Sequence, residues 1–195
     1  MRYNFYMEKH KPIIKRISEI FELGYVPCRG DESYFYKTKK LSKTGDLLNC
    51  FGHAVFNFTN EQLDSLNLCN SEIFELQGYT GHDLDKKDKQ EIADHFCGII
   101  KDAGLLVTAC SADATMKFNQ WKVALYFDKF TINNKSYIRD FHFLRQEKDG
   151  TWSGKSGYRP EVKKIDKLPQ NYDYYYTLFE VYSITNPHAK EDRNK

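Results

Sequence analysis

The sequence predicts an α+β fold in which helices pack on an antiparallel sheet. In the first half of the chain, apolar residues recur at helical spacing, whereas beyond residue 105 they alternate as in half-buried strands. An Asp-Gly pair between two of these strands marks a hairpin turn, Asp149-Gly150. The length of 195 residues, with 41% hydrophobic and 15% aromatic residues, fits one core. We therefore expect one domain spanning residues 1–195.

The first predicted helix covers residues 11–23 and belongs to an N-terminal helical segment, 1–24. Pro12 is tolerated in a first helical turn and Gly24 is placed to end the helix. Its apolar face consists of Ile13, Ile14, Ile17, Ile20, Phe21 and Leu23. Residues 25–48 mix Pro, Gly, Asp and Lys and predict an irregular loop with at most one short strand.

Three further helices are predicted before the strands begin. Apolar residues at i, i+3, i+4 and i+7 indicate a short helix with Cys50 in or beside its first turn: Phe51, Ala54, Val55 and Phe58. Thr59 and Gln62 form a candidate capping box for a second short helix. The third covers 86–103, with Asp85 as its candidate N-cap.

The strands are predicted by runs of alternating or continuous apolar residues. They cover residues 105–109, 121–127, 137–144, 151–153 and 172–184. Tyr172, Tyr174 and Tyr176 fall on one side of the last strand, where they would either pack or stack on a ligand. Residues 187–195 are polar and are expected to form a flexible tail.

Composition excludes several classes of function. The formal charge of +2 gives no strong nucleic-acid signal. No apolar run is long enough for a transmembrane segment, and the N-terminus lacks the apolar core of a signal peptide. We therefore expect a cytoplasmic protein, or one exported without a classical signal. The five cysteines include no CxxC pair and are expected to be reduced.

Neither a metal nor another cofactor is predicted. The best metal-ligand set would be His82, His95 and Cys97. Because His95 and Cys97 are two residues apart on a helix, they point to different sides. The Gly- and Ser-rich stretch 149–157 does not match a phosphate-binding P-loop.

Cys50 and His142 are the candidate catalytic residues. A helix N-terminus and a nearby imidazolium both favour the thiolate form of cysteine, which is the nucleophile. Cys50 meets the first condition, and His142 lies on a rigid strand. Alternation on that strand predicts that His142 shares a face with Ile138, Asp140 and Leu144.

The order of these features resembles the papain-like cysteine peptidase superfamily, especially its NlpC-type and CHAP amidase branches. Three short motifs carry the resemblance: Asn49-Cys50-Phe51-Gly52-His53-Ala54, WKVALYF at 121–127, and Asp140-Phe141-His142-Phe143. It implies a papain-like catalytic core at 49–160, in which Cys50 attacks a carbonyl and His142 is the general base. It also implies that the Cys50 backbone amide helps to hold the oxyanion.

The third residue of the papain-like pattern, which orients the histidine, has no clear match. Gly154 stands twelve residues after His142, where a polar side chain is usual in the family. Asp140, Gln146 and Ser153 are the possible orienting residues. His53 and Asn49 are further candidates for the cleft, by their nearness to Cys50 in the sequence.

The resemblance implies a hydrolase that cleaves an amide or isopeptide bond in a protein or peptide through a Cys50 thioester. The alternative is a catalytically inactive protein-binding or effector module on the same fold, which the missing orienting residue favours. Transglutaminase-like acyl transfer would use the same two residues. The sequence does not indicate the oligomeric state.

Overall fold

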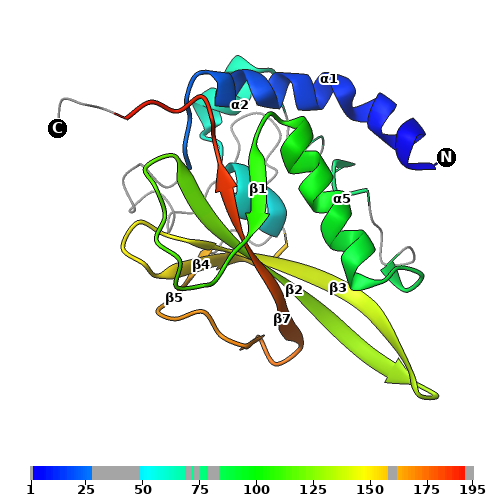
Figure 1. The fold of residues 1–195 in the computed structure, drawn as a ribbon. Coiled ribbons are helices and arrows are strands. Elements are labelled where there is room, and N and C mark those ends of the chain that lie inside the picture. The colour runs from blue at the N-terminus through cyan, green and yellow to red at the C-terminus, as the bar shows by residue number, and fades with distance from the viewer. Residues whose placement is uncertain are drawn as a thin grey trace.

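The computed structural model describes residues 2–27, 49–68, 72, 75–78, 84–157 and 162–191. They form an α+β fold, as predicted, with helices beside one open sheet (Figure 1). The helices are α1 (Arg2–Glu22), the π-helix η2 (Gly52–Phe56), α2 (Asn60–Ser65) and α5 (Lys89–Asp102). The strands are β1 (Leu106–Ala109), β2 (Gln120–Ile132), β3 (Lys135–Gln146), β4 (Trp152–Lys155), β5 (Val162–Ile165), β6 (Asn171–Tyr172) and β7 (Tyr176–Thr185).

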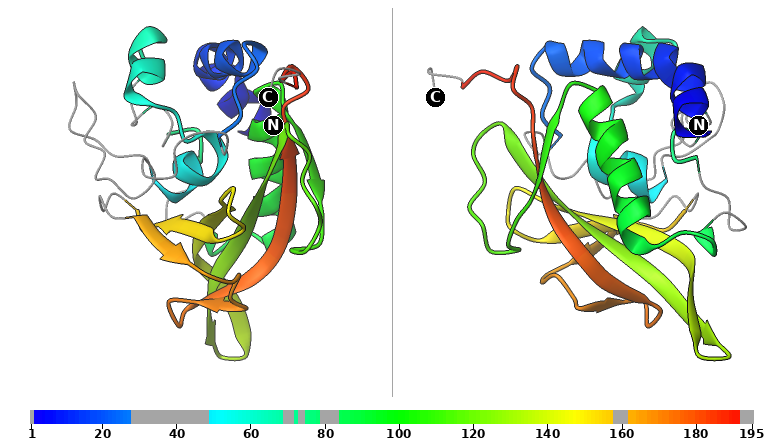
Figure 2. Two further views of the ribbon diagram at one scale, coloured as in Figure 1. Left: turned by 90° about the vertical axis from the view of Figure 1, so that its left-hand side faces the viewer. Right: turned by 45° about the vertical axis from the view of Figure 1, so that its right-hand side comes forward.

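The seven strands follow the order β1-β7-β2-β3-β4-β5, and β6 pairs with β7. Every pairing between the described strands is antiparallel. The long strands β2 and β3 form the centre of the sheet, and Figure 2 shows its twist from two further sides. No helix among the described residues is long and apolar enough to cross a bilayer.

The main core lies between the helices and one face of the sheet. Side chains of α1, η2 and α5 meet alternate residues of β2 and β3, and aromatic rings dominate the contact. Phe51, for example, packs on Phe96 of α5 and Phe143 of β3, with ring centroids 5.1 and 5.3 Å away. Burial of such rings is the main stabilising contribution to a fold of this kind.

The opposite face of the sheet carries a second, smaller apolar cluster. It consists of Ala124, Tyr126, Leu144, Trp152, Tyr172 and Val181. Because side chains alternate along a strand, β3 sends Phe141 and Phe143 to the main core and Leu144 to this second cluster. The sheet is therefore covered on both faces at its centre.

Two helix boundaries differ from the prediction. Helix α1 is longer than expected, and its apolar face is buried except for Leu23, which is 89% exposed. The N-cap of α5 is Asp88 and not Asp85: the Asp88 side chain accepts a hydrogen bond from the Glu91 N–H, and the Glu91 carboxylate accepts one from the Asp88 N–H. Both aspartates suit a cap, but only Asp88 has a glutamate three residues later. The capping box of Thr59 and Gln62 is confirmed.

The predicted last strand is interrupted. Asp173 and Tyr174 have φ angles of 47° and 65°, and this left-handed turn separates β6 from β7. Tyr172 is buried, whereas Tyr174 is 100% exposed. The prediction that Tyr172, Tyr174 and Tyr176 share one side of a continuous strand is therefore wrong, because the turn breaks the alternation.

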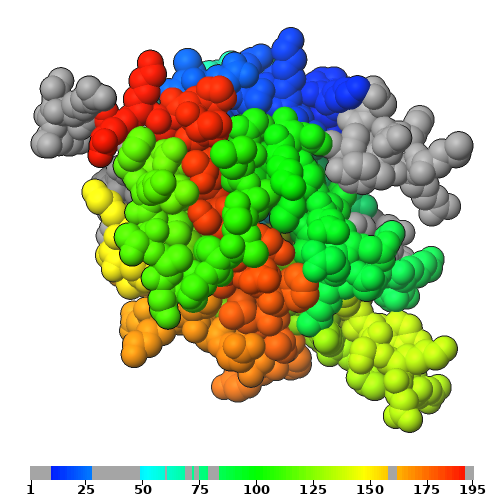
Figure 3. All heavy atoms as spheres, viewed as in Figure 1, coloured from blue at the N-terminus to red at the C-terminus, as the bar shows by residue number. Residues whose placement is uncertain are grey.

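A β-bulge changes the predicted faces of β3. The pairing of β2 with β3 shifts between Asp128 and Lys129, so that Asp128 opposes Asp140 while Lys129 opposes Ile138. The extra residue turns Ile138 into the main core, away from the face of His142. The prediction for Ile138 is therefore wrong, and that for Leu144 is confirmed. Beyond the bulge the hairpin projects from the molecule (Figure 3) and turns at Asn133 and Asn134.

The end of the described chain is anchored to α1. Asn186 is fully buried, and its Nδ2 group donates hydrogen bonds to the carbonyl oxygens of Phe21 and Tyr25, both at 2.8 Å. Ala189 is buried close to Gly24. The expected flexible tail, 187–195, thus begins with residues that pack on the fold, and its last four residues lie outside the described part.

Candidate active site

Cys50 is the first residue of a short helical segment, as the sequence predicted. The Asn49 side chain caps this segment, because its Oδ1 accepts a hydrogen bond from the Gly52 N–H at 2.9 Å. The His53 N–H donates to the Asn49 carbonyl, and the helix then widens, with the Asn57 N–H donating to the Gly52 carbonyl at 2.7 Å. As a first-turn residue, Cys50 has a backbone N–H without an acceptor inside the helix.

His142 projects from β3 on the face of the second apolar cluster, opposite Tyr126 of β2. Its imidazole lies parallel to the ring of Tyr172, with a centroid distance of 4.7 Å and an interplanar angle of 5°. The ring of Tyr176 is 5.4 Å away and tilted by 44°. Aromatic side chains of the β6–β7 hairpin therefore surround the histidine.

Cys50 and His142 line the same cavity, although 92 residues separate them in the chain. The cavity has a volume of about 160 Å³. Its described lining consists of Asn49, Cys50, Gln77, Asp140, Phe141, His142, Ser156, Gly157 and Tyr176. Cys50 is 7% exposed and His142 is 3% exposed, so both side chains are almost fully buried in its wall.

The electrostatic state of the two residues differs from the sequence expectation. Burial raises the pKa of Cys50 to about 12, and the Asp140 carboxylate also raises it, although the backbone N–H groups of Phe143 and Phe51 lower it. Burial lowers the pKa of His142 to about 4. At neutral pH the pair therefore consists of a thiol and a neutral imidazole, whereas a helix start and a histidine alone suggested a thiolate and an imidazolium.

Asp140 lines the cavity but does not orient His142. Its Oδ2 accepts a hydrogen bond from the Tyr176 hydroxyl at 2.6 Å, and its Oδ1 accepts one from the Phe141 N–H at 2.8 Å. The carboxylate thus holds Tyr176 in place.

His53, Ser153 and Gln146, which were possible site residues, lie outside the described lining of this cavity. His53 Nε2 and Ser153 Oγ are 3.0 Å apart, and the Ser153 hydroxyl donates to Glu147 Oε1. Arg145 donates to Glu147 Oε1 and to the His53 carbonyl, each at 2.9 Å. This buried polar network ties the Cys50 helix to β3 and β4. Gln146 donates to the Gly150 carbonyl at 3.3 Å, in the β3–β4 turn.

Gly154, at which the resemblance implied an orienting residue, lies beside the imidazole. A Cβ atom at Gly154 would be 3.4 Å from His142 Nε2, but it would also collide with a methyl group of Leu144. His142 Nε2 is buried and has no hydrogen-bond partner within the described part of the chain. Gly154 thus does not supply the orienting side chain that the resemblance implied.

Lys155 is a site-proximal residue that sequence reasoning missed. It ends β4 with its side chain buried, and its Nζ donates to the Gly157 carbonyl at 2.8 Å. Burial lowers the pKa of Lys155 to about 8, while the nearby Cys50 raises it. Its position in a Gly- and Ser-rich turn segment gave no signal of burial.

The described residues contain no group of three or more His, Cys, Asp or Glu side chains that could hold a metal ion. His95 instead lies with its Nε2 2.9 Å from the Gln77 carbonyl, and His82 lies outside the described residues.

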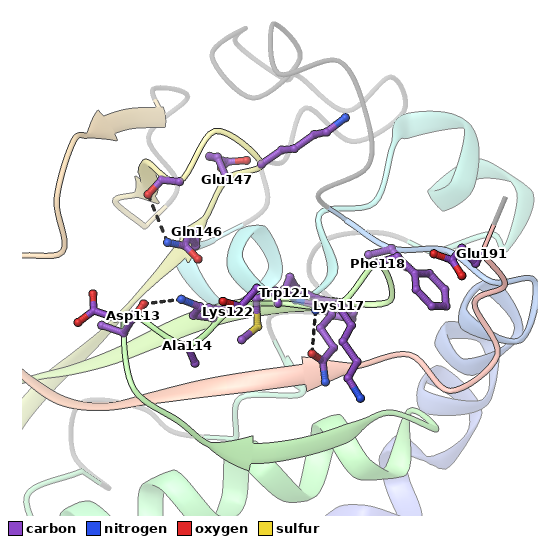
Figure 4. A pocket seen from close by; sticks show the side chains of 16 residues that line it. Asp113, Ala114, Lys117, Phe118, Trp121, Lys122, Gln146, Glu147 and Glu191 are labelled. Carbon is purple, nitrogen blue, oxygen red and sulfur yellow. Dashed lines mark hydrogen bonds between the residues drawn. The ribbon is translucent and has the colours of Figure 1, made fainter. Parts of the chain in front are cut away.

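A larger cavity, of about 810 Å³, lies at the other end of β3 (Figure 4). It opens between the segment 112–118, the start of β2 and the β3–β4 turn, and shares no described lining residue with the Cys50 cavity. The Lys122 side chain forms part of its wall and donates a hydrogen bond to the Ala112 carbonyl. Its walls carry both charges, from Lys122 and Glu147 among others.

Comparisons with known proteins identify no relative. No family model, no curated protein and no solved structure matches this chain.

Proposed function

We propose that this protein is a papain-like thiol hydrolase, which cleaves an amide or isopeptide bond in a protein or peptide. One observation carries the proposal: Cys50, at the start of a helical segment, and His142, on a central strand, line one cavity. A nucleophile and a base brought together from distant elements are the minimum for covalent acyl chemistry.

The reaction starts from the neutral pair. The Cys50 thiol transfers its proton to His142 as the sulfur attacks the carbonyl carbon, and the Cys50 backbone N–H stabilises the oxyanion. The C–N bond then breaks, and His142 returns the proton to the leaving amine. Water attacks the resulting thioester with His142 again accepting a proton, which releases the acid and restores the thiol. Transfer to an amine in place of water is the same step with another nucleophile.

The neutral form of His142 suits the first step, in which the Cys50 thiol gives up its proton. Because His142 has a pKa of about 4, it is unprotonated at neutral pH and available as a base. The Cys50 pKa of about 12 opposes early ionisation, so proton transfer and sulfur attack have to occur together.

The same pKa values favour a second candidate, a catalytically inactive binding module. A thiol with a pKa of about 12 beside an imidazole without a polar orienting residue resembles a packed core more than an activated pair. In this reading a ligand or protein partner occupies the larger cavity, and Cys50 is a buried apolar residue.

A small activated ester distinguishes the two candidates. We expect p-nitrophenyl acetate to acetylate Cys50. Release of nitrophenolate follows the reaction, and mass spectrometry locates the acetyl group on the peptide that contains Cys50. His142→Asn should slow this acetylation at least tenfold, since the base is lost.

The matched control is Cys110→Ser, which removes a more exposed thiol outside the described lining of the Cys50 cavity and should leave the acetylation of Cys50 unchanged. Acetylation of Cys110 or Cys97 as fast as that of Cys50, or no effect of His142→Asn, would contradict the hydrolase and support the binding module.

A further inference from the structure

A base that acts in acyl transfer has to keep its imidazole in a fixed orientation, and His142 does so without a hydrogen bond to Nε2. That atom is buried close to Gly154 and has no partner within the described residues. In papain-like enzymes a polar side chain fills this role. Another part of the molecule must therefore restrain the ring.

The β6–β7 hairpin supplies an aromatic surface for the imidazole. Tyr172 and Tyr176 oppose each other across this hairpin, with ring centroids 6.3 Å apart. Tyr172 stacks on His142 with an interplanar angle of 5°, and the hydroxyl of Tyr176 is fixed by Asp140. The left-handed turn at Asp173 and Tyr174 makes this pairing possible, because it folds Tyr172 back onto the sheet.

We propose that Tyr172, stacked on His142 and supported by the Tyr176–Asp140 pair, is the positioning residue of this site. It takes the place of the polar third residue of papain-like enzymes. The catalytic role of Tyr172 rests on the proposed function. The restraint of the His142 ring by Tyr172 does not depend on it.

The ring of Tyr172 carries this role, and its hydroxyl does not. No hydrogen bond joins the hydroxyl to the imidazole in the described part of the chain. A side-chain hydrogen bond with Ser156 instead offsets part of the rise that burial causes in the pKa of Tyr172. Stacking restrains the plane of the imidazole whichever nitrogen carries the proton. Burial under the ring also keeps water from His142.

Three variants distinguish the contribution of the Tyr172 ring from those of its hydroxyl and of the neighbouring turn. Tyr172→Phe keeps the stacked ring, and Tyr172→Leu removes it. Tyr174→Leu is the control, because it changes a fully exposed ring in the same turn. Each is examined by NMR titration of ¹⁵N-labelled histidine and by the rate of Cys50 acetylation. We expect Tyr172→Leu to move the pKa of His142 up toward 6.5 and to lower the acetylation rate at least tenfold. Tyr172→Phe and Tyr174→Leu should match the unmodified protein in both measurements.

The proposal is overturned if Tyr172→Leu leaves the titration of His142 and the acetylation rate unchanged, or if Tyr172→Phe is as slow as Tyr172→Leu. Should Tyr172→Leu not fold, Tyr176→Phe tests the support, because it removes only the hydrogen bond to Asp140. We expect it to slow acetylation about threefold, and an unchanged rate would refute the support by Tyr176 and Asp140. If the unmodified protein is not acetylated at Cys50, the proposed hydrolase fails, while the titration still decides whether Tyr172 restrains His142.

Discussion

Burial determines the ionisation of two individual side chains in this protein, Cys50 and His142. Both side chains border a cavity of about 160 Å³ and are almost closed to solvent, so desolvation outweighs the nearby charges in setting their pKa values. Each group is held in its neutral form over the physiological range. Two measurable consequences follow, one for stability and one for reactivity.

His142 makes the folded state sensitive to acid. Its pKa is about 4 in the folded protein against 6.5 in the unfolded chain, so the unfolded chain takes up a proton first as the pH falls. The contribution to stability is present above pH 6.5 and is lost as the pH falls toward 4. At about 1.4 kcal/mol per pH unit, it amounts to about 3 kcal/mol.

Urea unfolding at pH 4, 5, 6 and 7 measures this loss, and His142→Asn should flatten the dependence on pH relative to the unmodified protein. His95, whose pKa burial also lowers, is present in both proteins and so does not affect the difference. An equal slope in the two proteins would show that His142 is not buried as a neutral ring.

Cys50 should react with alkylating agents only slowly at neutral pH. Because its pKa is about 12, the thiolate fraction keeps rising through the alkaline range. We expect the rate of iodoacetamide labelling at Cys50, followed by peptide mass spectrometry, to increase without a plateau up to pH 10. Glutathione in the same solution provides the reference thiol, and a plateau at Cys50 below pH 8 would contradict the burial of this group.

The sequence predicted that Cys50 and His142 would lie close together, and both line one cavity, but it did not predict their ionisation. The helical period after Cys50 and the alternation around His142 are local patterns, so the elements that carry them were predictable. Burial and the collision of a Gly154 side chain with Leu144 depend on how distant strands meet. No local pattern contains that information, and Lys155 was missed for the same reason.

The helices and turns were predictable where the local hydrogen bonds that form them have a recognisable sequence pattern. The box of Thr59 and Gln62 was predicted because both residues stand at the required spacing. The turn at Asp173 and Tyr174 was not, because a left-handed conformation at tyrosine is uncommon and no glycine marks it. The bulge beside Asp128 likewise has no signature in the letters of β2 or β3.

The N-cap of α5 provides a test at this scale. Asp88→Ala removes the side chain that accepts from the Glu91 N–H, and we expect it to lower the free energy of unfolding by about 1 kcal/mol. Asp85→Ala, three residues earlier, is the matched control and should change it by less than about 0.5 kcal/mol. Urea unfolding at pH 7 measures both, and the reverse order would place the helix start at the position that the sequence first suggested.

Across the whole molecule, the two ends of the described chain close the main core together. Asn186 donates to the carbonyl oxygens of Phe21, in the last turn of α1, and of Tyr25, just beyond the end of the helix. The α+β class and the covered antiparallel sheet were predictable from the periodicities of the chain. This anchor was not, because it joins residues more than 160 positions apart.

Asn186→Ala tests the anchor. It removes three side-chain hydrogen bonds, to the carbonyl oxygens of Phe21 and Tyr25 and from the His188 N–H, and we expect it to lower the free energy of unfolding by about 2 to 3 kcal/mol. Asn119→Ala, which removes one partly buried bond to the Asn186 carbonyl, is the control and should cost about 1 kcal/mol. Thermal unfolding followed by circular dichroism compares the two, and equal effects would show that the fold does not depend on this anchor.

The bulge in the β2–β3 hairpin also bears on the alignment of the two strands. A slip of one residue would exchange the two faces of β3, and His142 would then enter the aromatic core while Phe143 faced the tyrosines. Arg139, the residue that the bulge sets apart, binds Asp128 at 2.6 Å and marks the correct alignment. A misaligned hairpin would thus place the imidazole among the aromatic rings of the main core and would lose the ion pair of Arg139 with Asp128, and both changes would destabilise it.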